Sequence, residues 1–192
     1  MESIGGESIP LWDEDRLVRT EPLLHGSARG DEAHAGTWQR PRLAIGRALL
    51  QLAQFSAQPQ SRFVSDIHCV TTWSRYDNRW EGLSTRDLLD ACRPRAEARF
   101  VVLHSHDGYT TNLALEDFAA EDALLAHSWS DAPLEAEHGG PVRLVVPHLY
   151  FWKSAKWLQS IELLAEDAPG YWEVRGYHNR GDPWKEERYS GD

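Results

Sequence analysis

The pattern of apolar and polar residues along the chain predicts several short strands. Apolar, largely β-branched runs of strand length are separated by clusters of Gly, Pro, Ser and Asp, which are typical of turns. These runs predict strands over residues 62–70, 99–105, 142–146, 157–164 and 172–177. Residues 99–105 form a compact apolar run, and the β-branched run over 142–146 is expected to be a buried strand.

Two segments have the pattern of helices instead. Residues 43–55 carry apolar residues at helical spacing, and Pro41 lies just before them. Residues 84–92 begin at Ser84, with Asp87 three residues later, which resembles a capping box. Since strands and helices do not alternate regularly, the pattern favours a single-domain α+β fold with a mixed sheet over a doubly wound α/β fold.

The first part of the chain differs from the rest. Residues 1–36 contain eight acidic residues against three arginines, with scattered Gly and Ser and little periodicity. Residues 1–35 are therefore predicted to be an acidic N-terminal arm, poorly ordered or irregular. Residues 36–192 are predicted to form one domain, a length sufficient for a proper core.

Charge and hydropathy exclude several classes of partner. The net charge of -10 argues against nonspecific nucleic-acid binding, which depends on Lys and Arg at phosphates. No apolar stretch is long enough to span a bilayer, so no membrane partner is expected. The N-terminus lacks the basic start and apolar centre of a signal peptide, which predicts a cytoplasmic location.

Cys69 is the residue that most changes this picture. The chain has only two cysteines, so a disulfide framework is not indicated. Cys92 lies in the pattern of a predicted helix and fits a small buried hydrophobe. Cys69 follows a predicted strand and is flanked by His68, hydroxyl residues and Trp73, which suits a metal ligand or a nucleophile. An inert buried thiol is the alternative reading.

Three blocks, in their order and spacing, resemble the sulfite oxidase family of molybdopterin-dependent oxidoreductases, in particular its small stand-alone members. The blocks are DIHCVTTWS at residues 66–74, EHGGPVRLVVP at residues 137–147 and YFWKSAKWL at residues 150–158. The resemblance covers about residue 60 to the C-terminus. It implies a mixed-sheet fold of the sulfite oxidase type and a cofactor of molybdenum with molybdopterin.

The resemblance also implies roles for individual residues. Cys69 would be the protein thiolate on molybdenum, which suits a soft sulfur ligand. Contacts to the pterin or its phosphate would come from Ser105, His138, Arg143, Ser154, Ala155 and Lys156. Arginine offers a planar fork of donors, and backbone N–H groups beside a lysine form an anion-binding nest.

The expected activity is oxygen-atom or two-electron transfer on a small-molecule substrate, sulfite or a sulfoxide. Tyr109 is the candidate catalytic residue, because it follows the end of a predicted strand and resembles the position where related enzymes have a tyrosine near the metal. A phenol there can donate a hydrogen bond to an oxyanion or relay a proton. His106, Arg75 and Arg180 are further candidates, and Trp73 and Trp152 are candidate pocket walls. An electron donor or acceptor protein, of unknown identity, is implied as a partner.

Two other functions remain open from the residues. A non-catalytic module that binds a cofactor or a partner would explain why residues 1–35 do not clearly supply the pterin contacts that relatives have there. A zinc hydrolase would use Cys69 with His68, His104, His106 or His138. No helix-spaced His-Glu-x-x-His pair and no Cys-x-x-Cys pair occurs in the sequence.

Overall fold

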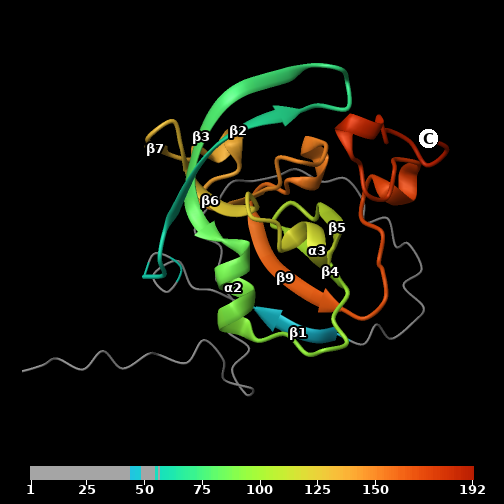
Figure 1. Cartoon of the computed structure of the whole chain (residues 1–192), viewed down its shortest axis with the longest axis horizontal. Helices are drawn as coiled ribbons and strands as arrows, with labels where there is room; N and C mark the ends of the chain where they lie inside the picture. Colours follow the sequence, from blue (N-terminus) through green and yellow to red (C-terminus); the bar gives the residue numbers. More distant parts are fainter. Residues whose placement is uncertain (1–43, 49–54, 56) are drawn as a thin grey trace, which may run out of the picture.

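Two antiparallel sheets and a few short helices make up the fold (Figure 1). The structure is a computed structural model, and it describes residues 44–48, 55 and 57–192. Every strand pair in these residues is antiparallel. The predicted α+β class is confirmed. None of the described helices is long and apolar enough to cross a bilayer.

The first sheet has the strand order β1-β9-β4-β5. Its strands are β1 (Ala44–Ala48), β4 (Phe100–Ser105), β5 (Thr110–Ala114) and β9 (Leu158–Leu164). The register pairs Leu103 of β4 with Thr111 of β5 on one side and with Ile161 of β9 on the other. The side chains of β4 are almost all buried, as its apolar run requires.

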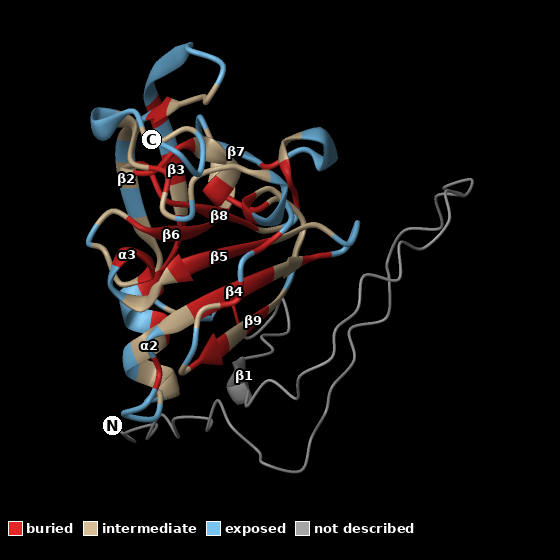
Figure 2. Ribbon diagram, turned by 90° about the vertical axis from the view of Figure 1, so that its right-hand side faces the viewer, coloured by how far each residue is buried: buried red, intermediate tan, exposed pale blue. Residues whose placement is uncertain are grey.

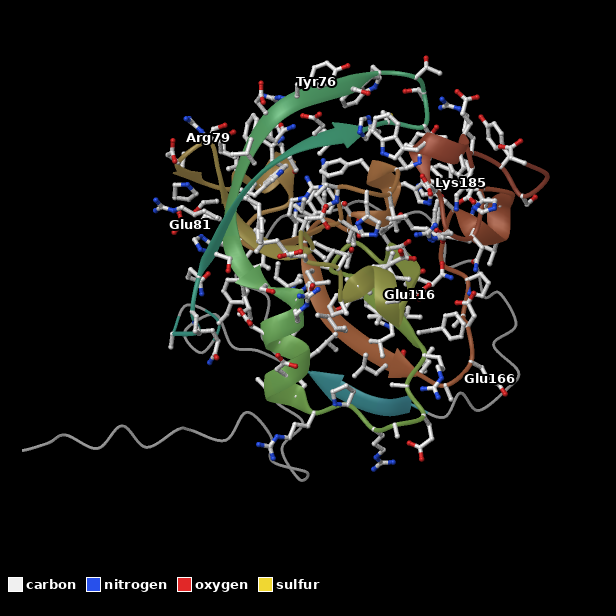
Figure 3. All side chains as sticks on the ribbon, viewed as in Figure 1. Tyr76, Arg79, Glu81, Glu116, Glu166 and Lys185 are labelled. Atoms are coloured by element: carbon white, nitrogen blue, oxygen red, sulfur yellow. The ribbon has the colours of Figure 1, made fainter. Side chains whose placement is uncertain are left out.

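The second sheet has the order β2-β3-β6-β7, and β8 also pairs with β6. Its strands are β2 (Ser61–His68), β3 (Ser74–Ser84), β6 (Leu124–Trp129), β7 (Ala132–Pro133) and β8 (Arg143–Val145). The long hairpin of β2 and β3 curves over the top of the molecule in Figure 1. Tyr76 and Arg79 on β3 are exposed, and Figure 3 shows them on the outside of the hairpin.

The α-helices are short. Those with described bounds are α2 (Thr85–Cys92) and α3 (Leu115–Phe118), and the described loops contain the 3-10 turns η1 (Ala136–His138), η2 (Phe151–Lys153), η3 (Glu173–Arg175) and η4 (Pro183–Lys185). The Oγ of Ser84 accepts a hydrogen bond from the backbone N–H of Asp87, so Ser84 is the N-cap that its sequence predicts. Leu88 is the buried apolar residue by which α2 packs onto the core.

The main core lies between the two sheets. It joins Val101 and Leu103 of the first sheet to Leu125 and Leu144 of the second, with Phe118 of α3 alongside. Figure 2 shows the central strands in red as the buried part of the molecule. This packing holds the facing ends of β4 and β8 close enough to share a pocket, described below.

The structure confirms the predicted strands at β2, β4, β8 and β9 and the predicted helix at α2. The predicted helix over 43–55 is wrong for residues 44–48, which form β1 and pair with β9; most of the rest lies outside the described residues. The predicted strand over 172–177 is also wrong. Glu173–Arg175 turn as a 3-10 helix, which Gly176 ends at φ +95°. The predicted arm, residues 1–35, lies outside the described residues and stays a prediction.

Candidate cofactor pocket

A pocket of about 280 Å³ opens where the ends of the two sheets meet. It is lined by Ser105, Asp107, Tyr109, Arg143, Phe151, Trp152, Ser154, Lys156, Trp157 and Trp172. Five of the predicted site residues are therefore brought together from segments far apart in the sequence. The pocket has the mixture of aromatic walls and a few polar groups that is typical of ligand sites.

Arg143 is the cation at the back of this pocket. It is 4% exposed, and burial lowers its pKa to about 10. Its guanidinium donates to the backbone oxygens of His138 at 2.8 Å and Ser154 at 2.9 Å, and it lies 4.4 Å from the ring centre of Phe151. No carboxylate among the described residues forms an ion pair with it. A buried positive charge without an anion favours binding of an anionic ligand.

Lys156 adds a second positive charge at the mouth of the pocket. Its Nζ donates to the backbone oxygen of Glu137 at 2.8 Å. Burial, followed by repulsion from Arg143, lowers the pKa of Lys156. Gly139 allows this arrangement, because it has φ +102° and a Cβ there would lie 2.9 Å from the Cβ of Lys156. Two neighbouring cations, of which Arg143 lowers the pKa of Lys156, would both be stabilised by a bound anion.

Two serines line the pocket, and they differ in whether their hydroxyl has a hydrogen-bond partner. Ser154 is 3% exposed; its Oγ accepts from the backbone N–H of Val146 at 3.0 Å, so its hydroxyl ties η2 to β8. Ser105, also 3% exposed, has a buried Oγ with no hydrogen-bond partner among the described residues. Leaving a buried hydroxyl unpaired costs about 1–3 kcal/mol, so this group is available to a ligand.

Tyr109 and Trp152 form a wall of the pocket together. The hydroxyl of Tyr109 donates to the backbone oxygen of Trp152 at 2.5 Å. Burial and the nearby carboxylate of Glu173 raise the pKa of Tyr109, so the phenol is protonated at neutral pH. A donation from Tyr109 to a substrate oxyanion would replace its hydrogen bond to Trp152.

Cys69 lies in the turn between β2 and β3 and does not line the pocket. Its Sγ is 3.1 Å from the Oγ1 of Thr71, and its backbone N–H donates to the carbonyl of Trp73. Arg188, near the C-terminus, donates to the carbonyl of Val70 and holds this turn from the other side. The thiol is a free cysteine of intermediate exposure, on a turn with fixed backbone.

Two other predicted contacts, His138 and Ala155, do not line the pocket either. His138 contributes its backbone oxygen to Arg143, while its ring lies edge-on to Trp129 and its Nε2 is 3.3 Å from Glu137. Ala155 is 1% exposed beneath the pocket. His138 therefore acts on the pocket through its backbone in this structure.

The weaker candidates have structural partners. Arg180 pairs with the carboxylate of Asp117 through Nε at 3.1 Å and Nη2 at 3.0 Å, and Arg75 lies 4.1 Å from the ring centre of Trp129. Trp73 is 53% exposed and is not a wall, whereas Trp152 is. His106 is exposed and is not among the lining residues.

The proposed zinc ligands are dispersed. His68 contacts Ser74, and His104 contacts Glu162. Among the described residues, the one group of three side chains placed to share an ion is Glu135, Glu137 and His138, two of them exposed carboxylates. It contains neither Cys69 nor a second histidine. The described geometry therefore gives the zinc alternative no support.

Another hollow of about 170 Å³ lies on the outer face of β2, β3 and β6. Its charged residues already pair with each other, Arg62 with Glu81 at 3.2 Å and Arg79 with Asp131 at 2.9 Å. These pairs are exposed, and the hollow lacks an unpaired cation or nucleophile. It is therefore a less suitable binding site than the pocket of Arg143.

Sequence reasoning missed several lining residues. Asp107, Phe151, Trp157 and Trp172 were not singled out. Trp157 and Phe151 are neighbours of predicted contacts in the third block, which is a signal that could have found them. Trp172 lines the pocket because the chain after β9 returns to the pocket. No local sequence pattern predicts this return.

Comparison with known proteins places the chain in a family. Residues 42–172 match the family described as the oxidoreductase molybdopterin binding domain. The chain is 50% identical over 144 residues to the uncharacterized oxidoreductase YuiH of Bacillus subtilis, covering 75% of this chain and 73% of that protein. It is 30% identical over 138 residues to the protein-methionine-sulfoxide reductase catalytic subunit MsrP of Campylobacter jejuni. That match covers 60% of this chain and 44% of MsrP.

A solved structure has a similar fold. The sulfane dehydrogenase SoxCD of Paracoccus pantotrophus superposes with a TM-score of 0.57 at 16% identity, covering 65% of this chain and 37% of that chain. Together with the family match, this likeness confirms the sulfite oxidase-type fold and the molybdenum–molybdopterin cofactor expected from the three sequence blocks. The chain belongs to the sulfite oxidase family of molybdopterin-binding oxidoreductases.

Proposed function

We propose that the pocket of Arg143 holds the organic part of the molybdenum cofactor, and that the protein transfers an oxygen atom or two electrons to or from a small sulfur compound, sulfite or a sulfoxide. The observation that carries the proposal is the charge of Arg143, which is 4% exposed, has no ion-pair partner among the described residues and faces a pocket. The relative MsrP, by its name, acts on methionine sulfoxide.

The described residues fit this cofactor. A phosphate-bearing pterin needs cations and free hydrogen-bonding groups, and the pocket offers Arg143, Lys156 and the unpaired hydroxyl of Ser105. Ser154 and Ala155 would contribute backbone groups beside Lys156. His138 would act through its backbone oxygen, which orients Arg143. The aromatic rings of Trp152, Trp157 and Trp172 would cover the flat heterocycle.

Cys69 is the residue proposed to bind the metal. The thiolate is the form that binds soft metals, and the turn that carries Cys69 is fixed by hydrogen bonds at both ends. The bound cofactor supplies the two-electron oxygen-transfer chemistry. The protein binds and orients it and shapes access to it.

Tyr109 is proposed as the group that acts on the substrate. Its phenol is protonated, because burial and Glu173 raise its pKa. It can donate a hydrogen bond to a substrate oxygen in exchange for the carbonyl of Trp152. Lys156 at the pocket mouth attracts an anionic or strongly dipolar substrate. A two-electron exchange further requires an electron donor or acceptor, which we propose to be a separate protein.

Elemental analysis tests the proposal. Protein expressed with ample molybdate is analysed by plasma mass spectrometry as wild type, Cys69→Ala and Cys92→Ala. The expected result is about one molybdenum per chain in the wild type and in Cys92→Ala, with a loss of metal or an altered absorption spectrum in Cys69→Ala. Cys92 is a suitable control, because burial raises its pKa to about 12 and it lies on α2, away from the pocket. Zinc or no metal in all three proteins would overturn the proposal.

A second measurement tests the substrate. Oxidation of sulfite with a dye as electron acceptor is compared with reduction of a sulfoxide by a reduced dye. Turnover of either substrate by the molybdenum-loaded protein supports the proposal. Loaded protein that shows no turnover with either would favour the non-catalytic module.

A further inference from the structure

A buried ion pair lies behind the pocket wall and has no role in the function proposed above. The Nζ of Lys153 is 2.7 Å from the Oε1 of Glu173, and the two side chains are 0% and 1% exposed. Burying two charges is costly unless the geometry and the surrounding hydrogen bonds compensate for the lost hydration. The contacts of each partner show which parts of the pocket wall this ion pair holds in place.

Lys153 is fully engaged within the protein. Its Nζ also donates to the backbone oxygen of Asn112 at 2.9 Å, to the Oδ1 of Asn112 at 3.0 Å and to the backbone oxygen of Asn179 at 2.6 Å. An ammonium group has three donors, so nothing remains for a ligand. The lysine therefore ties η2 to β5 and to the loop before η4, and it pairs with the carboxylate of Glu173.

Glu173 directs one oxygen toward the pocket wall. Its Oε1 accepts from the indole Nε1 of Trp152 at 3.0 Å and from the Oγ1 of Thr111 at 3.2 Å, in addition to Lys153. Its Oε2 is buried without a partner among the described residues. Hydrogen bonds to an ionised acceptor are about twice as strong as neutral ones, so this carboxylate is a strong anchor for the indole.

Trp152 is fixed on its other sides as well. Its ring stacks on Tyr150 with centroids 5.2 Å apart and meets Tyr177 edge-on at 5.1 Å. A Cβ on Gly181 would lie 2.7 Å from the indole, so the backbone there packs directly against the ring. The carbonyl of Trp152 accepts the Tyr109 hydroxyl, and both residues line the pocket. The position of Trp152 therefore determines where its own indole and the hydroxyl of Tyr109 lie in the pocket wall.

We propose that Glu173 is a positioning residue for the cofactor pocket. Its carboxylate, held by Lys153, fixes the indole of Trp152 in a single orientation and thereby places the aromatic wall and the acceptor of the Tyr109 hydroxyl. The assignment of the wall to a cofactor rests on the function proposed above. The coupling of Glu173 to Trp152 does not depend on it.

Indole N–H resonances test the coupling in the full-length protein as purified, labelled with ¹⁵N, whether or not it holds molybdenum. The chain has nine tryptophans, so the indole region is simple, and Trp152→Phe identifies the resonance of Trp152. The Trp152 indole proton should exchange with solvent at least about a hundredfold more slowly than that of Trp184, which is 79% exposed. Equal exchange rates would overturn the proposal without the need for any Glu173 variant.

Glu173→Gln then removes the charge and keeps the shape. Glu162→Gln is the matched control, because Glu162 is also a largely buried carboxylate, 12% exposed at its side chain, but it lies on β9 and pairs with His104 of β4. In Glu173→Gln, the Trp152 resonance should shift and its proton should exchange about tenfold faster, as expected when a charge-assisted hydrogen bond becomes neutral. In Glu162→Gln it should stay unchanged.

Retention of the cofactor gives the second readout. Molybdenum should be lost during dialysis about tenfold faster from Glu173→Gln than from the wild type or Glu162→Gln. Wild-type protein without molybdenum would count against the proposed function alone, since the indole measurement still reports on Glu173. Loaded protein in which Glu173→Gln changes neither the Trp152 resonance nor the retention would overturn the positioning role alone.

Discussion

The guanidinium of Arg143 lies 4.4 Å from the ring centre of Phe151, while its two terminal nitrogens donate to the carbonyls of His138 and Ser154. The arginine is thus held by an aromatic face and by two carbonyls of different loops. The planar fork reaches both carbonyls while its face lies against Phe151, and the compact ammonium group of a lysine has neither this fixed spacing nor this flat face. This relationship explains why the residue can be buried and cationic before any anion binds.

Arg143→Lys should therefore lose cofactor although it keeps the charge. One of the two carbonyls loses its donor, so the free energy of unfolding should fall by about 1–3 kcal/mol, and molybdenum per chain should fall about tenfold. Urea unfolding and plasma mass spectrometry measure the two effects. Arg62→Lys, at an exposed ion pair with Glu81, should change neither. Full molybdenum content in Arg143→Lys would contradict the role of the fork.

Tyr109→Phe separates a structural role of the phenol from a catalytic one. The variant leaves the carbonyl of Trp152 without its donor, which should cost about 1–2 kcal/mol of unfolding free energy. If the phenol also donates to the substrate oxygen, the turnover rate should fall by about 10²–10⁴-fold while molybdenum content stays at the wild-type level. Dye-linked turnover and elemental analysis of the same sample distinguish the two.

The control for this variant is Tyr76→Phe, because Tyr76 is 67% exposed on the outer side of the hairpin (Figure 3). It should have wild-type stability and turnover. A turnover rate in Tyr109→Phe within twofold of the control would leave Tyr109 a purely structural role.

His148 should make the free energy of unfolding depend on pH above neutrality. Burial alone would lower the pKa of His148, but hydrogen bonds to Asp117 and Asp122 raise it to about 9. A raised pKa contributes stability below the pKa of the unfolded state, about 6.5, and this contribution is lost as pH rises through about 9. The free energy of unfolding should fall by about 1–2 kcal/mol between pH 6 and pH 10, since partial exposure screens the interaction.

Urea unfolding at several pH values checks this expectation, with His148→Gln as the reference. The glutamine variant has no titrating group at this position, so its curve should lack the decline between pH 6.5 and pH 9. Parallel curves for the two proteins would show that the pair with Asp117 does not contribute.

Some buried strands were predictable from their own residues. β4 begins with the apolar run Phe100–Leu103, and β8 lies in the mostly apolar stretch 142–146, so both were predicted. β5 and β6 are also largely buried but were not predicted, because polar residues interrupt their apolar ones. β3 was missed because its first half, Ser74–Asp77, is exposed and polar; hydrogen bonds with β2 and β6, not its own composition, make it a strand. The segment 172–177 has a strand-like composition, yet it contains a 3-10 turn, and Trp172, just before that turn, lines the pocket.

The site residues that lie in or near the sequence motifs were predictable from the spacing of those motifs. Ser105, Tyr109, Arg143, Ser154 and Lys156 all line the one pocket. The contributions of Trp172 and Glu173 depend on where the chain returns after β9, which is a property of the tertiary fold. The assignment of Cys69 to the metal stays a prediction.

The pocket has a consequence for how the molecule comes apart. Ser105 belongs to β4 of the first sheet and Arg143 to β8 of the second, and both line the pocket, so a ligand bound to both connects the two sheets. Such a ligand acts as a non-covalent cross-link between the sheets. Unfolding of either sheet alone would separate the two residues and release the ligand. Ligand-bound protein should therefore unfold in one cooperative step at a higher temperature than the ligand-free protein, in which this cross-link between the two sheets is missing.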